Sequence, residues 1–387
     1  MSKWEWKEFE DCIERVKYTT KIPSKDYLQE GEFPIVSQED CLISGYWNDR
    51  SDLFKVTKPI VIFGDHTKVL KYIDFDFVLG ADGVKILCPK DYLNAHFFFY
   101  FLKSVNFDNL GYARHYRLLK ELSVPIPPLS EQKRIVKFLD EEISKIETLK
   151  TNAETNLKNA KELFETTLEK ELNPLSRHSE RSEESSADLP SGWEWKTLQE
   201  ISNVYGEYGL SVPSTSYNGI RYLRITDITD DGQLNDEYVS ADIEKIEESD
   251  KLQEGDILFA RTGATVGKTL IFKEDYGCCV FAGYLIRYRP KKEVVLPFYL
   301  HYVTHSKSYF DWVKKSQKAA AQPNISAKLY NAFQIPLPPL SVQKEIVARL
   351  DKLSENVKRL EANYKQIIAN CDELKKSILK KTFEGES

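Results

Sequence analysis

The sequence predicts an α+β protein with two tandem mixed α/β domains, each followed by a long helix, and the two helices pairing as an antiparallel coiled coil. Trp-Glu-Trp-Lys at residues 4–7 returns at 193–196, and Pro-Pro-Leu-Ser at 127–130 returns at 338–341. After each Pro-Pro-Leu-Ser, roughly 44 residues without Pro or Gly place apolar side chains at alternating steps of four and three, which is a heptad pattern. Because both halves repeat the same order, the chain is a tandem duplication.

Composition restricts the class of protein. At 387 residues the chain is long enough for two or three domains with sizeable cores. It contains no apolar run of about 18 residues and its N-terminus has no apolar signal sequence, so we expect a cytoplasmic protein without membrane contact. Its six cysteines show no C-x-x-C spacing, which is typical of free thiols in a reducing compartment.

The net charge of −6 conceals an uneven distribution. Residues 194–250 carry a net charge of −9, whereas residues 251–336 carry +7. The first half repeats this more weakly, with −5 over residues 1–84 and +3 over 85–124. A basic half in each domain favours binding of a phosphate backbone, although solvated helix faces can produce the same distribution.

The first domain, residues 1–124, reads as a mixed α/β unit. Strand-like runs occur at residues 33–36, 59–63, 75–79 and 84–88, and residues 94–104 have the aromatic density of a buried helix. A basic, aromatic segment at 111–121 precedes the first spacer helix, residues 125–172. Residues 173–192 contain two prolines and a Ser/Glu/Arg-rich core, so they are predicted to form a linker.

The second domain, residues 193–335, repeats this plan. Strand-like runs fall at residues 222–225, 256–260, 269–272 and 284–288, a helix is expected at 297–306, and the second spacer helix covers 336–383. Residues 322–328 occupy the place of the 111–120 segment. Ser130 and Ser341 are predicted N-caps. The linker is too short to run back easily along a long helix, so the helices should be antiparallel, with the domains at opposite ends and suited to inverted half-sites.

Motif tests argue against catalysis. The segment Gly263-Ala-Thr-Val-Gly-Lys-Thr resembles a phosphate-binding loop but has three residues between its glycines instead of four. The Pro-Pro pairs lack the polar and aromatic neighbours with which adenine methyltransferases hold a flipped base, and no glycine-rich turn suits a methyl-donor cofactor. The six histidines show no metal-ligand spacing. We therefore predict no catalytic residue and no metal.

Several loop residues have side chains suited to nucleic acid. Arg261, Thr262 and Lys268 lie in a glycine-rich hairpin that can present them to a phosphodiester. Amides such as Gln322 and Asn324 suit bidentate contact with adenine, and Arg261 or Arg114 can pair with guanine. His66 and His115 lie in polar loops and can bond base edges or phosphates. Each of these side chains can instead stabilise its own loop.

The two Trp-Glu-Trp-led domains, each followed by Pro-x-Pro-Pro-Leu-Ser-x-Gln-Lys-x-Ile-Val and a long helix, resemble the specificity subunit of type I restriction-modification enzymes. Arg-Thr-Gly-Ala-Thr-Val-Gly-Lys at 261–268 and Gln-Pro-Asn-Ile at 322–325 are similar to stretches of that family's target recognition domains. The first domain departs from this pattern in both places. The expected DNA-binding residues are His66, Thr67, Arg114, His115, Tyr116, Lys120, Arg261, Thr262, Lys268, Gln322, Asn324 and Lys328.

The resemblance implies a non-catalytic subunit that selects a bipartite site in double-stranded DNA. Each recognition domain reads one half-site, and the helices set the spacing and dock two methyltransferase subunits. Those partners methylate adenine N6 with S-adenosylmethionine, and motor-nuclease subunits can join the complex. Two alternatives are an enzyme that fuses recognition with methylation and a coiled-coil scaffold that binds only protein. The failed motif tests count against the first, and the duplicated basic loops against the second.

Overall fold

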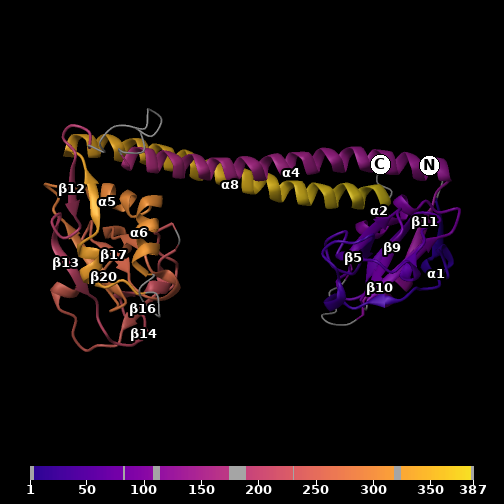
Figure 1. The fold of residues 1–387 in the computed structure, drawn as a ribbon, viewed down its shortest axis with the longest axis horizontal. Helices are drawn as coiled ribbons and strands as arrows, with labels where there is room; N and C mark the ends of the chain where they lie inside the picture. Colours follow the sequence, from indigo (N-terminus) through magenta and orange to yellow (C-terminus); the bar gives the residue numbers. More distant parts are fainter. Residues whose placement is uncertain are drawn as a thin grey trace. The chain divides into compact units, whose positions relative to one another are not determined.

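The computed structural model describes residues 4–81, 83–107, 114–173, 189–229, 231–317 and 324–384. The chain divides into two compact units, one made of Met1–Thr155 with Tyr364–Ser387 and the other of Asn156–Asn363. Each unit therefore contains one globular domain, part of the helix that follows it, and part of the other long helix (Figure 1). Most of the predicted linker, residues 174–188, lies outside the described residues.

A four-stranded antiparallel sheet forms the centre of the first unit. Its order is β2 (Ile13–Glu14), β10 (Val84–Pro89), β7 (Ile60–Gly64) and β8 (Leu70–Ile73). Every residue of β7 is buried, in line with its continuous apolar sequence. Helix α2 (Ala95–Ser104) packs its phenylalanines into the same core, together with the short helix α1 (Phe9–Cys12). The Asn94 side chain caps α2 by accepting from the backbone N–H groups of His96 and Phe97, both at 3.0 Å.

A second, mixed sheet completes this domain. Its strands are β3 (Lys21–Ile22), β9 (Phe77–Gly80), β4 (Phe33–Val36) and β5 (Gly45–Trp47), and β6 (Leu53–Phe54) also pairs with β9. Strand β9 runs parallel to β3 and β4 and antiparallel to β6. Because β9 is central, all four of its residues are buried.

The second unit has the same kind of four-stranded antiparallel sheet. The order is β13 (Ser202–Tyr208), β20 (Leu285–Pro290), β17 (Ile257–Ala260) and β18 (Thr269–Ile271). Helices α5 (Pro297–Val303) and α6 (Lys307–Gln317) pack against it. Two small sheets adjoin it: β14 (Ser214–Ser216) with β16 (Val239–Ala241), antiparallel, and β15 (Arg221–Leu223) with β19 (Cys279–Phe281), parallel.

The strands and helices expected from apolar runs are present near their predicted positions, with ends shifted by up to a few residues. The sequence-based prediction missed α6 and several strands, among them β8 and β13 of the two central sheets and the short strands β2, β3, β5, β6, β14, β16 and β19. Connections also contain short 3₁₀ helices, which are Ser24–Asp26, Arg50–Asp52, Ile225–Asp227, Glu248–Asp250, Gly263–Thr265 and Glu274–Tyr276. No helix in the described ranges is long and apolar enough to cross a bilayer.

The two repeated motifs meet in space. In the first unit β1 (Glu5–Glu8) pairs with β11 (Ser123–Ile126), which places Trp6 opposite Pro125. In the second unit β12 (Glu194–Thr197) pairs with β21 (Gln334–Leu337), which places Trp195 opposite Pro336. The Trp-Glu-Trp-Lys motif is therefore one strand of an antiparallel ribbon whose other strand leads into the Pro-Pro turn. This ribbon joins each domain to its long helix.

The long helices α4 (Leu129–Leu172) and α8 (Leu340–Glu384) begin one residue before the predicted serine N-caps. That capping prediction is wrong, because a proline precedes the first helical residue and its carbonyl already accepts helical bonds. The Pro128 carbonyl accepts from the N–H groups of Glu131 and Gln132 at 2.8 and 3.0 Å. The serines lie in the first turn.

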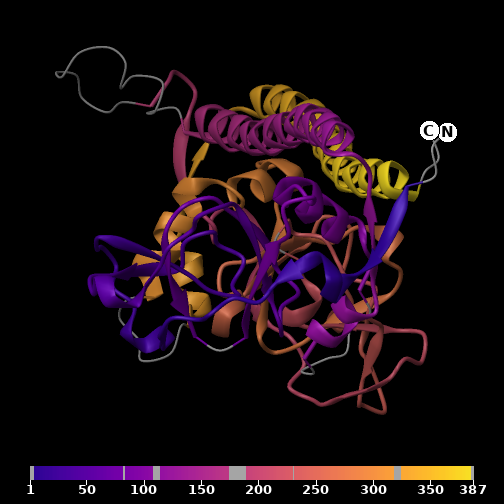
Figure 2. The same cartoon turned by 90° about the vertical axis from the view of Figure 1, so that its right-hand side faces the viewer.

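Within each unit the two long helices run antiparallel. In the first unit Lys150 pairs with Asp372 at 2.6 Å, and Glu147 pairs with Lys375, so numbers rise along α4 as they fall along α8. In the second unit Arg349 pairs with Glu171 at 2.7 Å. The two ribbons lie side by side in both views (Figures 1 and 2). The coiled coil predicted from the heptad pattern and the antiparallel direction predicted from the short linker are both confirmed.

Each globular domain also packs against the long helix that belongs to the other half of the sequence. The ring of Phe383, near the end of α8, lies 5.3 Å from that of Phe97 and 5.6 Å from that of Phe101 in the first unit. In the second unit Leu168 and Leu172, at the end of α4, are buried in the core that contains Leu350. The C-terminal end of each long helix therefore packs against the globular domain of the other half of the sequence.

Candidate nucleic-acid interface

Four chain segments meet at one end of the central sheet of the second unit. Tyr208 is the last residue of β13, Tyr284 directly precedes β20, Arg261 directly follows β17, and Lys268 directly precedes β18. The register places these positions beside one another, because Tyr208 lies opposite Ile286 and Ala260 lies opposite Leu285. The antiparallel order thus gathers two aromatic and two basic side chains at one sheet end.

Arg261 is held from several directions. Its backbone N–H donates to the Tyr284 carbonyl at 3.1 Å, and its carbonyl accepts from the Ile325 N–H at 2.9 Å. Its Nε donates to Asn324 Oδ1 at 3.4 Å, and its guanidinium lies 4.8 Å from the centre of the Tyr208 ring. The ring and the amide orient the guanidinium while leaving other N–H donors available.

The remaining predicted residues of this unit surround Arg261. Thr262 forms an isolated bridge with Asn324, so the glycine-rich hairpin and the segment before α7 (Ala327–Asn331) are directly linked. Lys268 approaches the Ile228 carbonyl with its Nζ at 3.5 Å. Lys328 is exposed on α7. Gln322 lies outside the described residues. The structure therefore brings together Arg261, Thr262, Lys268 and Asn324.

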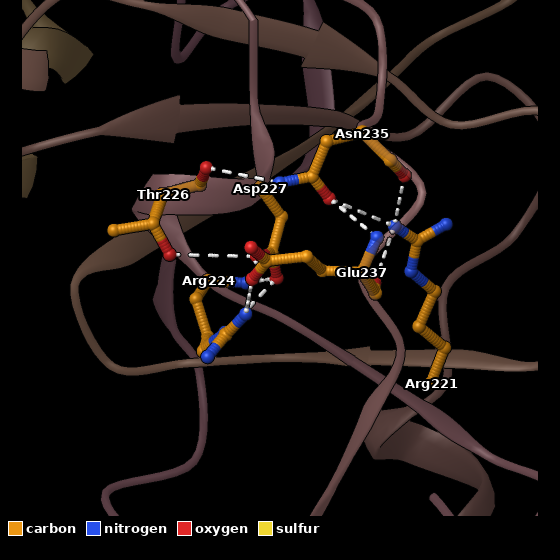
Figure 3. Close-up of polar contacts among 6 residues, drawn as sticks. All are labelled: Arg221, Arg224, Thr226, Asp227, Asn235 and Glu237. Carbon is orange, nitrogen blue, oxygen red and sulfur yellow. Dashed lines mark hydrogen bonds and ion pairs between the residues drawn. The ribbon is translucent and has the colours of Figure 1, made fainter. Parts of the chain in front are cut away.

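A cluster of charged and polar side chains braces the loop that supports Lys268 (Figure 3). Arg221 is buried and donates through Nη2 to the backbone carbonyls of Asn235 and Glu237 at 2.6 and 2.8 Å. Arg224 pairs with the buried Asp227 at 2.7 Å and with Glu237 at 2.9 Å. These contacts join the two ends of the loop that contains Ile228, so the brace fixes the backbone beside the sheet end.

The equivalent place in the first unit has the same backbone connections and different side chains. Asp65 directly follows β7, as Arg261 directly follows β17. The Asp65 N–H donates to the Gly83 carbonyl at 2.7 Å, as the Arg261 N–H donates to the Tyr284 carbonyl. The Asp65 carbonyl accepts from the His115 N–H at 2.8 Å, where Arg261 uses Ile325. The matched bonds establish that the segments before α3 (Tyr116–Lys120) and α7 are equivalent.

Asp65 is an internal anchor. It is 2% exposed, its Oδ1 accepts from the Tyr116 N–H at 2.8 Å, and Lys85 Nζ lies 3.6 Å from its Oδ2. His115 is 1% exposed, and its Nδ1 lies 3.0 Å from the Asp65 carbonyl. A buried ring is not available to a ligand. The expectation that His115 contacts DNA is therefore corrected: it holds the loop in position.

The exposed groups of the first unit lie around α3. His66, Thr67, Arg114 and Lys120 are exposed. The Thr67 hydroxyl donates to the Gln38 carbonyl at 2.6 Å, and Lys120 pairs with Glu10 at 2.6 Å. Both side chains are thus partly engaged within the domain.

Two ammonium groups lie close to the ring of Tyr116. Lys85 Nζ is 5.2 Å and Lys120 Nζ is 5.8 Å from the centre of its ring. Burial raises the pKa of the Tyr116 phenol, which keeps the phenol neutral and able to donate. The first unit therefore presents a basic, aromatic helix where the second presents a basic, aromatic hairpin.

Asp65, Tyr208 and Tyr284 were not among the residues selected from sequence. Asp65 lies in the loop that drew attention to His66, but nothing local distinguishes a buried anchor from an exposed ligand. The two tyrosines lie at strand ends that become neighbours only when the sheet forms. Within the described part of the chain, no group of three His, Cys, Asp or Glu side chains is arranged to hold a metal ion.

Fold and sites together define a class of protein with tandem α/β domains, each presenting basic and aromatic groups at one end of its sheet, joined by an antiparallel coiled coil. The family model described as type I restriction modification DNA specificity domain matches residues 1–158 and 190–369. The chain belongs to this family.

Individual relatives agree with this assignment. The chain is 27% identical over 364 residues to the type I restriction enzyme EcoBI specificity subunit of Escherichia coli, covering 88% of this chain and 75% of that one. It is 23% identical over 411 residues to the MjaVIII specificity subunit of Methanocaldococcus jannaschii, covering 99% and 92%.

Solved structures share the fold. One comes from work on complex assembly and conformational transition of the type I R-M system, with a TM-score of 0.73, 21% identity, and coverage of 100% of this chain and 99% of that one. The HsdS subunit from Thermoanaerobacter tengcongensis gives a TM-score of 0.57 at 22% identity, covering 99% and 97%.

Proposed function

We propose that this chain is the DNA specificity subunit of a type I restriction-modification complex and that each unit reads one half of a bipartite DNA site. The observation that carries the proposal is the duplicated sheet end, built on the same backbone bonds in both units and bearing different side chains. Two sites with the same backbone scaffold and different side chains suit two different ligands of one chemical class. Family membership identifies that class as DNA.

In the second unit, Arg261 and Asn324 read base edges, with Thr262, Lys268, Lys328 and Gln322 on bases or phosphates around them. A guanidinium suits guanine and an amide suits adenine. Arg261 is already oriented by Tyr208 and Asn324, which reduces the entropy lost on binding.

In the first unit, His66, Thr67, Arg114, Tyr116 and Lys120 form the corresponding DNA-binding set. Arg114 and Lys120 supply positive charge, and Tyr116 supplies a neutral hydroxyl on a ring close to two ammonium groups. His115 and Asp65 shape the loop and do not touch DNA. The domain boundaries follow this division: recognition domains at residues 1–124 and 193–335, spacer helices at 125–172 and 336–383, and a linker at 173–192.

The chain itself carries no chemistry in this proposal. Two methyltransferase subunits, which bind S-adenosylmethionine, dock along the helices and methylate adenine, and motor-nuclease subunits join to cut DNA. Large apolar side chains left exposed on the helices support docking, namely Phe138, Leu149 and Leu163 on α4 and Leu360, Ile367 and Leu374 on α8. The complex acts on DNA in the cytoplasm.

The test is co-expression with the cognate methyltransferase subunits and mapping of modified adenines in host DNA. Arg261→Ala should relax or abolish recognition of one half-site, with a loss of about 1–3 kcal/mol in binding free energy. Arg261→Lys keeps the charge but loses the planar fork and the stacking on Tyr208, so it should not restore specificity. Arg114→Ala is the matched variant of the first unit and should affect the other half-site.

Two results would contradict the proposal. If both arginine variants altered the same half-site, the assignment of one unit to each half would be wrong. If the purified chain methylated DNA without a partner subunit, it would be an enzyme instead of a specificity subunit.

A further inference from the structure

Tyr284 combines high exposure with a rigid backbone. Its side chain is 61% exposed, the highest value among the large apolar side chains in the described ranges. It lies in a tight turn closed by the bond from the Leu285 N–H to the Ala282 carbonyl at 2.8 Å. The Gly283 N–H donates to the Leu210 carbonyl at 2.8 Å, and the Tyr284 carbonyl accepts from Arg261. An aromatic ring held out by a fixed backbone loses little freedom when it binds.

The turn that holds Tyr284 cannot move without disturbing its neighbours. A Cβ at Gly283 would lie 2.8 Å from Ser211 Oγ, and one at Gly209 would lie 2.2 Å from the Phe281 carbonyl oxygen. The strand carrying Tyr208 therefore packs closely against this turn. Tyr208 is itself fixed, because its hydroxyl accepts from the Ala327 N–H at 3.1 Å while its ring lies under the Arg261 guanidinium. Tyr208 therefore orients the Arg261 guanidinium, whereas the Tyr284 side chain projects into solvent from the same sheet end.

We propose that Tyr284 enters the DNA duplex at the half-site read by the second unit and stacks on a base that it separates from its neighbour. This inference rests on the proposed function. Apolar and aromatic side chains that insert between base pairs unstack and kink the duplex, and stacking of a base on an aromatic ring is sequence-tolerant. Arg261, bonded to the Tyr284 backbone, and Lys268 hold the DNA beside the inserted ring.

The first unit has no side chain at the position equivalent to Tyr284. Gly83 occupies the place of Tyr284, since its carbonyl accepts from Asp65 as that of Tyr284 accepts from Arg261. Gly83 has a φ of 97°, and a Cβ there would lie 2.4 Å from Gln38 Oε1. A side chain at this position is therefore disfavoured by the backbone conformation, and it would also require the flexible Gln38 side chain to move. The distortion is confined to the half-site of the second unit.

The experiment uses the full complex of this chain with its methyltransferase subunits and duplexes that contain its methylated motif. Each duplex carries 2-aminopurine, which brightens when unstacked, at one position of one half-site. The methylated adenine and its immediate neighbours are left unlabelled, because the methyltransferase subunits flip that adenine out of the stack in both half-sites. The variants are Tyr284→Ala and Tyr284→Phe, with Tyr205→Ala, 47% exposed within β13, as the matched control.

We expect wild type, Tyr284→Phe and Tyr205→Ala to raise 2-aminopurine emission at one or two positions of the second unit's half-site. No such position should appear in the other half-site. Tyr284→Ala should lose that signal and bind DNA about tenfold or more weakly, because a base–aromatic stack is lost. The dependence of affinity on salt should stay unchanged, since no charge is removed.

A Tyr284→Ala variant with wild-type emission and affinity would overturn the inference. So would a variant that binds DNA normally but assembles poorly with the methyltransferase subunits, which would make Tyr284 a protein contact. Loss of affinity in Tyr284→Phe as well would assign the hydroxyl, not the ring. In all these results the wild-type complex still selects its motif, so the proposed function stands; a wild-type complex without sequence selectivity would reject the proposed function instead.

Discussion

A buried glutamine joins each domain to its long helix, and its replacement is the most quantifiable test of the fold. Gln343, in the first turn of α8, is fully buried. Its Oε1 accepts from the Leu296 N–H at 2.8 Å, and its Nε2 donates to the carbonyls of Val294 and Pro338 at 3.0 and 2.8 Å. One side chain therefore ties the start of the helix to the segment that leads into α5.

Gln132 makes the same three bonds in the first unit. Its Oε1 accepts from the Asn94 N–H at 2.7 Å, and its Nε2 donates to the carbonyls of Tyr92 and Pro127 at 2.9 and 2.8 Å. Replacement of either glutamine by Ala leaves one N–H and two carbonyls without these partners. A buried group left unsatisfied costs about 1–3 kcal/mol, and some of these groups can reach water, so we expect a loss of about 2–5 kcal/mol in unfolding free energy.

Urea unfolding of the full chain measures this loss. Gln132→Ala and Gln343→Ala should cost similar amounts, and Gln343→Glu should cost at least as much at neutral pH, because a carboxylate would face two carbonyl oxygens. Gln366→Ala, in an exposed position of the same helix, is the control and should change stability by less than about 0.5 kcal/mol. The reasoning fails if Gln343→Ala and Gln366→Ala prove equally stable.

Two further predictions concern titratable groups, the buried Asp65 and the partly buried His301. Asp65→Ala should lower the unfolding free energy by about 1.5–3 kcal/mol, because Tyr116 N–H and Lys85 lose a charged acceptor, whereas Asp65→Asn keeps an acceptor for Tyr116 and should cost less; equal urea midpoints would refute this. Burial, with His305, Lys273 and Lys358 nearby, holds the pKa of His301 well below its usual 6.5. The unfolded chain therefore gains a proton below about pH 6.5 that the folded chain does not, so stability should fall as the pH drops through that range. His301→Gln should weaken this slope between pH 7.5 and 5.5, and an unchanged slope would show that His301 is not its source.

The sequence by itself determined the architecture, because architecture depends on patterns that repeat along the chain. The heptad spacing of apolar residues predicted both long helices, and the short linker favoured their antiparallel pairing. The duplicated motifs predicted two domains of one kind. The sequence alone also shows that the phosphate-loop and methyltransferase motifs are not matched, since those motifs need particular residues at fixed spacing.

Only the tertiary structure decided the role of individual side chains. His66 and His115 both lie in polar loops, yet the first is exposed and the second is buried, since burial depends on which distant segment packs above a residue. A glutamine near the start of a helix, such as Gln132 or Gln343, is indistinguishable in sequence from a surface residue. Its burial depends on three backbone partners, which come from the turn before the helix and from the segment before α2 or α5.

The sheet ends show the same limit most clearly. Arg261 and Asp65 occupy equivalent positions, but their sequence contexts differ, and only matched backbone bonds to Tyr284 and Gly83 reveal the equivalence. A charged residue after a strand is exposed or buried according to the space left by neighbouring strands. That space is set by residues far away in the chain, so it exists only once the sheet has formed.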